Sequence, residues 1–351
     1  MFCNTDTVKY TIMKYGFLLL IFFAVTGTAG AQEQTAKLLQ ETARTLVQKG
    51  DYTNAAMILE RARQQEPDNI NILRDLCFAY YLGRDFSKAI ETGKVLVENP
   101  NADQQSFQVL GLAYKAIASY KECDKLYRTA LRKFPNSGVI YNEYAELFAS
   151  ENDLDEAIIQ WEKGIEADPN YSSNYYNATM YYTRKANWIR AALYGELFLN
   201  LESYSARTEE IKLQLYTSWK NLLAAGTIQQ LKGQKSVSAF EKTVLDLLAK
   251  TASKARPLVS ADILTAIRTG FIVEWAAAQQ KNYPFQLFSN QQYLVSQGLF
   301  EAYTYWLFAP SLDAGVYQAW QKSHPKETAG FTAYQQSRVF KAPSGEYYFS
   351  H

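Results

Sequence analysis

A spacing of 34 residues recurs through the first half of this 351-residue chain and constrains its fold more than any other feature. A small side chain stands at every step, and a bulky apolar side chain precedes each of them by three residues. The small column is Ala55, Ala89, Cys123, Ala157 and Ala191, and the bulky column is Tyr52, Phe86, Tyr120, Leu154 and Trp188. A fixed period of about 20–50 residues is typical of repeat arrays, so we expect stacked copies of one small structural unit.

The residues between these columns predict two helices per unit. Mostly turn-forming pairs precede the bulky positions; they are Gly50-Asp51, Arg84-Asp85, Ala118-Ser119, Asn152-Asp153 and Ala186-Asn187. Four units close at a proline, which stops a helix because it lacks a donor N–H; these are Pro67, Pro100, Pro135 and Pro169. A second small column lies twelve residues before the first, at Ala43, Cys77, Gly111 and Ala145. Small residues let two helix axes approach, so we expect an all-α solenoid of helical hairpins that stack into a superhelix.

This pattern resembles the tetratricopeptide repeat (TPR), which has small residues and aromatics in fixed places and a proline at the end. The matching residues are Ala43, Gly50, Tyr52, Ala55, Ala62 and Pro67 in unit one, Gly111, Tyr114, Tyr120, Ala130 and Pro135 in unit three, and Ala145, Ala157 and Pro169 in unit four. The resemblance covers residues 36–203 and indicates five units. A degenerate sixth unit at 206–232 would continue the spacing through Tyr216 and Ala225.

The resemblance implies a non-enzymatic scaffold that binds a protein or peptide on its concave face, which the first helices of the units line. In the family's register that face carries Arg44, Arg74, Phe78, Tyr81, Gln108, Leu112, Lys115, Asn142, Glu146, Tyr176, Asn177, Met180 and Arg184. Aromatic, amide and charged side chains together suit a peptide laid in a groove. The family's carboxylate clamp is not matched, because Gln40 and Arg44 stand where that set has Lys and Asn.

The second half of the chain is predicted to be a helical domain at 233–341 with a tail at 342–351. Apolar residues at helical spacing predict a helix that ends at Arg256-Pro257 and a next helix capped by Ser260. Further helices are expected from Leu294 to Phe308, stopped by Pro310, and from Gly315 to His324. This domain is expected to cover the apolar end of the last repeat.

The richest aromatic segment of that half, residues 300–308 (FEAYTYWLF), allows two interpretations. One is a pocket that stacks aromatic rings on a sugar or a hydrophobic peptide. The other is a packed core, in which tyrosine hydroxyls find hydrogen-bond partners. Helical spacing of the aromatics favours the core.

Reactive side chains are few, which argues against an enzyme. The chain has 36 basic and 35 acidic residues, two His and three Cys, and its near-zero net charge argues against nucleic-acid binding. Cys77 and Cys123 fall in the small columns and are expected to be buried thiols. No metal site, cofactor site or catalytic residue is predicted. The alternative is an envelope carbohydrate-active protein that uses two carboxylates, Glu274 and Glu301, in the carboxy-terminal half.

The amino-terminal 31 residues have the pattern of a secretory signal peptide. Nine apolar residues, Phe17–Val25, follow Lys9 and Lys14 and precede the small-residue triplet Ala29–Ala31. The apolar run is short for a membrane span, and Met13 is an alternative start. We therefore expect an exported, periplasmic or envelope-associated protein without a stable membrane span after cleavage; an uncleaved anchor is the alternative.

Overall fold

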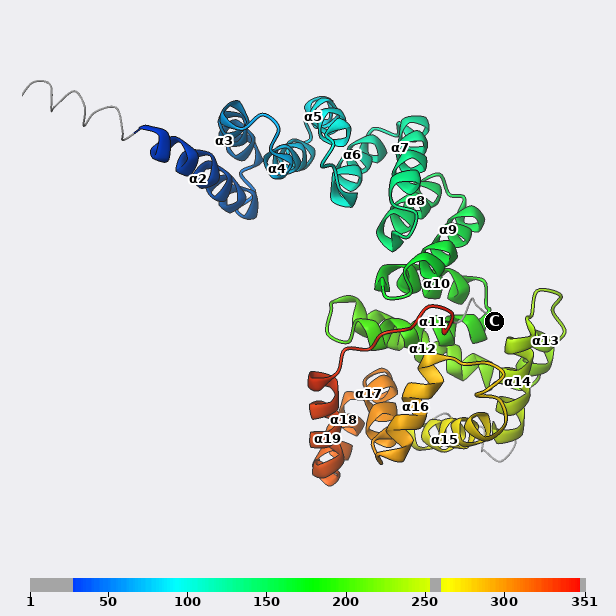
Figure 1. Ribbon diagram of the computed structural model, residues 1–351. Coiled ribbons are helices and arrows are strands. Elements are labelled where there is room, and N and C mark those ends of the chain that lie inside the picture. Colours follow the sequence, from blue (N-terminus) through cyan, green and yellow to red (C-terminus); the bar gives the residue numbers. More distant parts are fainter. Residues whose placement is uncertain (1–27, 253–259, 348–351) are drawn as a thin grey trace, which may run out of the picture. The chain divides into compact units, whose positions relative to one another are not determined.

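A computed structural model describes residues 28–252 and 260–347, and every regular element in these ranges is an α-helix (Figure 1). The prediction of an all-α fold is confirmed. The apolar run Phe17–Val25 and the expected helix end at Arg256-Pro257 lie outside the described residues. Within the two described ranges, no helix combines the length and apolar character that a membrane span requires.

Ten helices form five hairpins with the predicted 34-residue spacing. The hairpins are α2 (Thr28–Gln48) with α3 (Tyr52–Gln65), α4 (Ile70–Leu82) with α5 (Phe86–Glu98), α6 (Gln104–Ala116) with α7 (Tyr120–Lys133), α8 (Gly138–Ser150) with α9 (Leu154–Ala167), and α10 (Ser172–Arg184) with α11 (Trp188–Leu201). The second helices begin at the bulky column, and four of them end two residues before the predicted prolines. The expected signal-processing triplet Ala29–Ala31 falls at the start of α2.

The turn between the two helices of a hairpin has the same backbone geometry five times. Its first residue has a left-handed φ, which is +80° at Gly50, +61° at Arg84, +54° at Ala118, +63° at Asn152 and +54° at Ala186. The N–H of the following residue donates to the carbonyl five residues earlier, as from Asp51 to Leu46 at 2.9 Å. This arrangement satisfies a carbonyl that the end of the first helix leaves without a partner.

The second residue of four turns then begins the next helix. The side chains of Asp51, Asp85, Asp153 and Asn187 each accept a hydrogen bond from the backbone N–H three residues further on. Such a cap pairs one of the donors that a helix start exposes, and it contributes about 1 kcal/mol. Each predicted turn pair of this kind therefore ends one helix with its first residue and starts another with its second.

Both small columns are buried where the paired helices approach. Ala55, Ala89, Cys123, Ala157 and Ala191 have no exposed surface. Gly111 shows how close the approach is, because a Cβ built there would lie 1.9 Å from the hydroxyl oxygen of the buried Tyr127. The prediction that small residues mark the helix contacts is confirmed.

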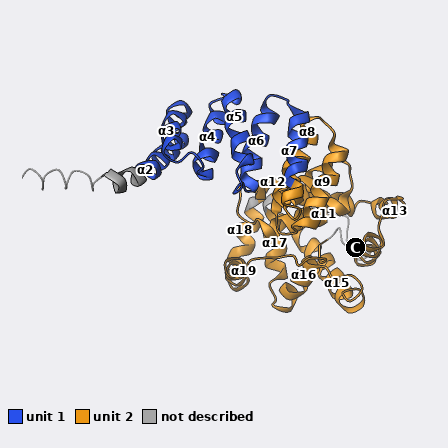
Figure 2. Ribbon diagram, turned by 45° about the horizontal axis from the view of Figure 1, so that its top comes forward, with its two compact units in different colours: residues 1–130 blue, residues 131–351 orange. Residues whose placement is uncertain are grey.

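Contacts divide the chain into two compact units, residues 1–130 and 131–351 (Figure 2). The buried apolar side chains of the first unit include one cluster around α2–α4 and another around α4–α6. In the second unit one continuous cluster extends from Ala145 to Tyr347. The last two hairpins thus share a core with the helices that follow them.

The carboxy-terminal helices differ from the predicted ones in two places. They are α12 (Arg207–Leu222), α13 (Thr227–Lys232), α14 (Ala239–Ala252), α15 (Ala261–Ala278), α16 (Gln286–Ser296), α17 (Phe300–Leu312), α18 (Ala314–Ser323) and α19 (Pro325–Ser337). The single helix expected from Leu294 to Phe308 is wrong, because Gly298, with a φ of +69°, ends α16 before α17 begins. Pro310 does not stop α17, which continues to Leu312.

Pro325, directly after the expected Gly315–His324 helix, occupies the first turn of α19, where its missing N–H costs nothing. Ser260 caps α15 as predicted, accepting from the N–H of Ile263 at 3.3 Å.

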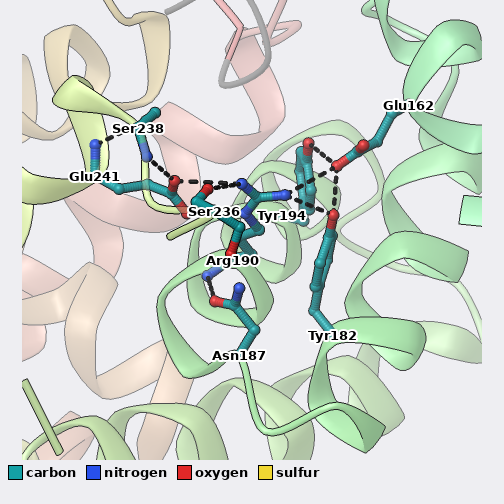
Figure 3. Close-up of polar contacts among 8 residues, drawn as sticks. All are labelled: Glu162, Tyr182, Asn187, Arg190, Tyr194, Ser236, Ser238 and Glu241. Carbon is teal, nitrogen blue, oxygen red and sulfur yellow. Dashed lines mark hydrogen bonds and ion pairs between the residues drawn. The ribbon is translucent and has the colours of Figure 1, made fainter. Parts of the chain in front are cut away.

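A polar network joins α11 to the start of α14. Figure 3 shows Arg190 between Glu241 on one side and Tyr182 and Glu162 on the other. The guanidinium donates to Glu241 at 2.8 Å and to the Tyr182 hydroxyl at 2.8 Å, and Tyr182 and Tyr194 donate to Glu162 at 2.7 and 3.1 Å. Burial raises the pKa of Glu162 even though these donors favour its ionised form.

A second buried network joins α11 to α15, α16 and α17. The carboxylate of Glu196 accepts from Arg268, from Gln291 at 2.5 Å and from the Tyr303 hydroxyl at 2.8 Å. The guanidinium carbon of Arg268 lies 5.1–5.6 Å from four aromatic ring centres, those of Trp219, Phe300, Tyr303 and Phe308. The aromatic segment 300–308 is therefore packed core, as its spacing predicted, and it encloses an ion pair.

Candidate peptide-binding faces

The predicted arginines of the first unit bind acidic side chains of the neighbouring repeat. Arg44 on α2 donates to Asp75 on α4 at 2.8 Å, and Gln40 donates to the same carboxylate at 2.7 Å. Arg74 on α4 donates to Asp103 at 3.0 Å and to Gln105 at 2.5 Å. These two ion pairs connect one repeat to the next, and the carboxylates neutralise the arginine charges.

Toward the end of α4, the same face carries aromatic side chains. Phe78 and Tyr81 on α4 are stacked, with ring centres 6.1 Å apart, and Phe86 lies 6.1 Å beyond Tyr81. Phe78 remains 38% exposed, whereas phenylalanine side chains are most often buried. Leu112 on α6 occupies the equivalent repeat position and is half-buried, as are Gln108 and Lys115. The first unit therefore presents an apolar step, formed by Phe78, Tyr81 and Leu112, with the polar side chains of Gln108 and Lys115 beside it.

In the second unit the predicted face is mostly polar. Asn177 on α10 donates to the Asn142 side-chain oxygen and to Glu146, both on α8 and both at 3.0 Å. Tyr176 donates to Glu210 on α12 at 2.7 Å, and burial together with this bond raises the pKa of Tyr176 to about 12. Met180 is half-buried, whereas Arg184, the last residue of α10, is exposed.

These contacts follow a rule that the sequence analysis missed. Asp75 binds residues 35 and 31 positions earlier, and Asn177 binds residues 35 and 31 positions earlier as well. The two bridges therefore occupy equivalent positions of different repeats. A search for polar pairs at these separations would have found both bridges, and with them the partner Asp75.

The same rule explains why Phe78 is exposed. The residue 31 positions after Phe78 is Val109, which is buried and cannot make the polar bridge that Asp75 and Asn177 make. At the position of Phe78 the first-helix face consequently carries an aromatic side chain in place of an ion pair or an amide–carboxylate pair. Among the predicted face residues, Phe78 has the properties of a contact anchor: a large ring that is partly exposed and held by a second ring.

A larger hollow lies on another part of the first unit. A groove of about 430 Å³ between α3, the end of α4 and the start of α5 is lined by Met57, Glu60, Arg61, Tyr80 and Lys88 among others. The Tyr80 hydroxyl donates to Glu60 at 2.9 Å, and Lys88 pairs with Asp85. None of the predicted face residues lines this groove.

The two candidate catalytic carboxylates have separate partners. Glu274 on α15 pairs with Lys250, and Glu301 on α17 accepts from the indole N–H of Trp320 at 2.9 Å. Neither partner is shared, so this geometry does not favour a paired-carboxylate site. Within the described residues, no three His, Cys, Asp or Glu side chains are grouped as a metal site would require.

Both cysteines of the small columns are buried free thiols, as predicted. Burial raises the pKa of the Cys77 thiol to about 12, so it stays protonated at neutral pH.

Helical hairpins of fixed length with a lined first-helix face define a helical repeat protein. The tetratricopeptide repeat family matches this chain twice, over residues 46–108 and 110–172. Residues 46–172 therefore consist of tetratricopeptide repeats.

Solved structures similar to this chain have low identity to it. TTC0263, a thermophilic TPR protein of Thermus thermophilus, is 15% identical with a TM-score of 0.42, covering 52% of this chain and 98% of its own. The pilF protein of Pseudomonas aeruginosa is 15% identical with a TM-score of 0.44, covering 61% and 97%. YrrB, described as a TPR protein with an unusual peptide-binding site, is 17% identical with a TM-score of 0.36, covering 53% and 96%. Comparison with curated proteins found no match.

Proposed function

We infer that this chain is a scaffold that holds a protein partner through the first-helix faces of its repeats. The observation that carries this proposal is the Phe78–Tyr81 pair, which stays partly exposed while the arginines beside it are bound to neighbouring repeats. A partner side chain placed against these rings would remove them from water, which is how aromatic anchors supply most of the affinity of an interface.

The chemistry of the face indicates the class of partner. Because Asp75 and Asp103 neutralise Arg44 and Arg74, the face offers no converging pair of free cations to hold a terminal carboxylate. The apolar step of Phe78, Tyr81 and Leu112 instead favours a peptide segment with a large aliphatic or aromatic side chain. Polar side chains at Gln108 and Lys115 would then contact the peptide backbone or its flanking residues.

The proposal includes export. The amino-terminal charge and apolar pattern supports a signal peptide, and it leads us to expect a periplasmic or envelope partner. This part rests on the sequence pattern alone.

The test compares two variants of the first unit. A partner captured from envelope extract is identified by mass spectrometry, and its affinity for the purified protein is then measured by calorimetry. We expect Phe78→Ala with Tyr81→Ala to weaken binding about 30-fold or more, as loss of an anchor worth about 2 kcal/mol would do. Helicity by circular dichroism should not change.

Val95→Ala is the matched control. Val95 lies on α5, a second helix of the same unit, and is 42% exposed. Its truncation should leave the affinity unchanged. Equal affinities of the double variant and the wild type would contradict the assignment of this face.

A further inference from the structure

The segment after α19 crosses the second unit without forming a helix. Residues 338–347, called here the carboxy-terminal strap, run without regular structure to Pro343, turn tightly with Glu346 N–H donating to the Pro343 carbonyl at 3.1 Å, and reach Tyr347. In Figure 1 the strap leaves α19 and runs toward α11. Phe340 of the strap shares a small hollow with Leu199 and Asn200 of α11.

Alternate side chains of the strap are buried, as for a peptide lying in a groove. Phe340 and Ala342 are buried, whereas Val339, Lys341 and Pro343 are exposed, Val339 by 79%. After the turn, Tyr347 is buried again. An extended chain directs successive side chains to opposite sides, so this alternation shows that one side of the strap faces the protein.

The backbone of the strap is held by a single amide side chain of the repeats. Asn170, in the turn between α9 and α10, accepts from the Ala342 N–H at 2.9 Å and donates to the Ala342 carbonyl at 3.2 Å. Its own N–H donates to Asp168 at 3.1 Å, which fixes the turn. Further along, the Gln286 N–H donates to the Glu346 carbonyl at 3.0 Å.

Backbone pairing with pockets for alternate side chains is a recognised mode of peptide binding. The Asn170 side-chain amide binds both the backbone N–H and the backbone carbonyl of Ala342. It could bind these two groups of any residue except proline at that position. The side chains of Phe340, Ala342 and Tyr347 supply the selectivity. The strap therefore has the contacts of a bound peptide ligand, but it is attached to its own receptor.

We propose that the strap fills a peptide-binding site in the second unit and that an external extended peptide can take its place. The matching peptide carries an aromatic residue, a small residue two positions later and a second aromatic five positions after that. Five of the ten strap residues are exposed, so releasing it uncovers only a few buried side chains. This site is separate from the face that contains Phe78, and the proposal does not depend on that face.

Because the strap is part of the same chain, it competes with an external peptide and lowers the apparent affinity for that peptide. A tethered segment competes at an effective concentration of about millimolar, so the intact chain should bind an external peptide weakly. The apparent affinity rises in proportion to the fraction of molecules whose strap is released. Weakening the strap's own anchors should therefore increase binding of an external copy.

The experiment uses the full chain and a fluorescent, end-blocked peptide with the sequence of residues 338–347. Binding is measured by fluorescence anisotropy to the wild type and to the Phe340→Ala, Tyr347→Ala variant. We expect the variant to bind the peptide at least about tenfold more tightly than the wild type does. Adding Asn170→Ala to the variant should reduce this binding about tenfold, because both backbone bonds are lost.

The matched control replaces exposed strap residues. Val339→Ala with Lys341→Ala should bind the peptide as weakly as the wild type, and a peptide with alanine at both aromatic positions should not bind. Absence of peptide binding to a variant of wild-type helicity would overturn the proposal, as would equal binding to variant and wild type, or no effect of Asn170→Ala.

A measurement on the wild type keeps the test valid if the variant fails to fold. Hydrogen exchange of the Ala342 amide should be faster than exchange of the interior amides of α11, because the strap opens without unfolding the unit. Equal protection of the two would show that the strap is released only by global unfolding, and would overturn the proposal.

Discussion

One turn residue in each repeat has a left-handed backbone, and only the first repeat places a glycine there. Gly50 tolerates its φ of +80°, whereas Ala118 and Ala186 adopt +54° with a β-carbon present. This conformation costs a residue with a β-carbon about 1–2 kcal/mol. The bonds around the turn, such as the Ser119 N–H to the Tyr114 carbonyl at 2.9 Å, maintain it.

Replacing Ala118 by glycine should therefore stabilise the protein. We expect Ala118→Gly to raise the free energy of unfolding by about 1 kcal/mol, since relief of the left-handed strain exceeds the entropy that glycine adds to the unfolded chain. Urea unfolding followed by circular dichroism measures the change. The control is Ala116→Gly at the last residue of α6, where helical backbone predicts a loss of up to about 1 kcal/mol. A loss of stability at both positions would contradict the claim that the backbone of Ala118 is strained.

At the scale of elements, α11 connects the repeats to the carboxy-terminal helices through buried charge. Glu196 and Arg268 are almost fully buried, and the donors around Glu196 come from α15, α16 and α17. Removing one member of such a pair leaves the other charge buried without compensation, which costs more than the pair itself contributes.

The expected cost can be measured on the single variants Arg268→Met and Glu196→Gln and on their double variant. Arg268→Met should lower the free energy of unfolding by about 3–5 kcal/mol, because the Glu196 charge loses its cation. Adding Glu196→Gln removes that charge while keeping an acceptor for Tyr303, so the double variant should recover a substantial part of the loss. Denaturant midpoints give the comparison.

The control for this cycle is an exposed ion pair. Arg128→Ala removes the partner of Asp124 on α7, and solvent screening predicts a change of about 0–1 kcal/mol. Additive losses for Arg268→Met and Glu196→Gln would show that the two charges do not stabilise each other.

At the scale of the whole molecule, the two units use different kinds of core. Each repeat of the first unit contacts its sequence neighbours, and its buried side chains include separate clusters around α2–α4 and α4–α6. In the second unit, α12 contacts α17, and residues more than one hundred positions apart share one cluster. A repeat array depends on nearest-neighbour contacts, whereas the second unit depends on long-range ones.

The proposed export also concerns the chain as a whole. If the signal peptide is processed after Ala31, the mature protein recovered from the expressing cell should begin at Gln32, as shown by intact-mass measurement and amino-terminal sequencing. A substitution of Ala29 and Ala31 by bulky residues should block the cleavage, because the peptidase requires small side chains at these positions. A protein that retains Phe17–Val25 in its purified form would favour the uncleaved anchor.

The repeat fold was predictable from sequence because its causes are local and recur every 34 residues. Small residues at helix contacts, turn pairs and closing prolines each act within a few positions, so the helix bounds of the first half followed from them. The prediction of one helix from Leu294 to Phe308 failed because it used apolar spacing alone. That spacing continues through Gly298 and does not indicate the left-handed turn there.

The candidate face was predictable only as a set of positions. Repeat register placed Arg44, Arg74 and Phe78 on first helices, and that information is contained in the sequence. The register could not tell that Asp75 and Asp103 neutralise the arginines while Phe78 remains partly exposed. These outcomes depend on side chains of adjacent repeats, at separations of 29–31 residues.

The sequence alone determined that this protein is a stack of helical hairpins, because periodic local preferences are sufficient to specify a repeat. Only the tertiary structure decided how the carboxy-terminal half packs, with Asn170 holding the backbone of Ala342 across 172 positions and Glu196 paired with Arg268. Such contacts follow no period, since they form between segments that the fold alone brings together.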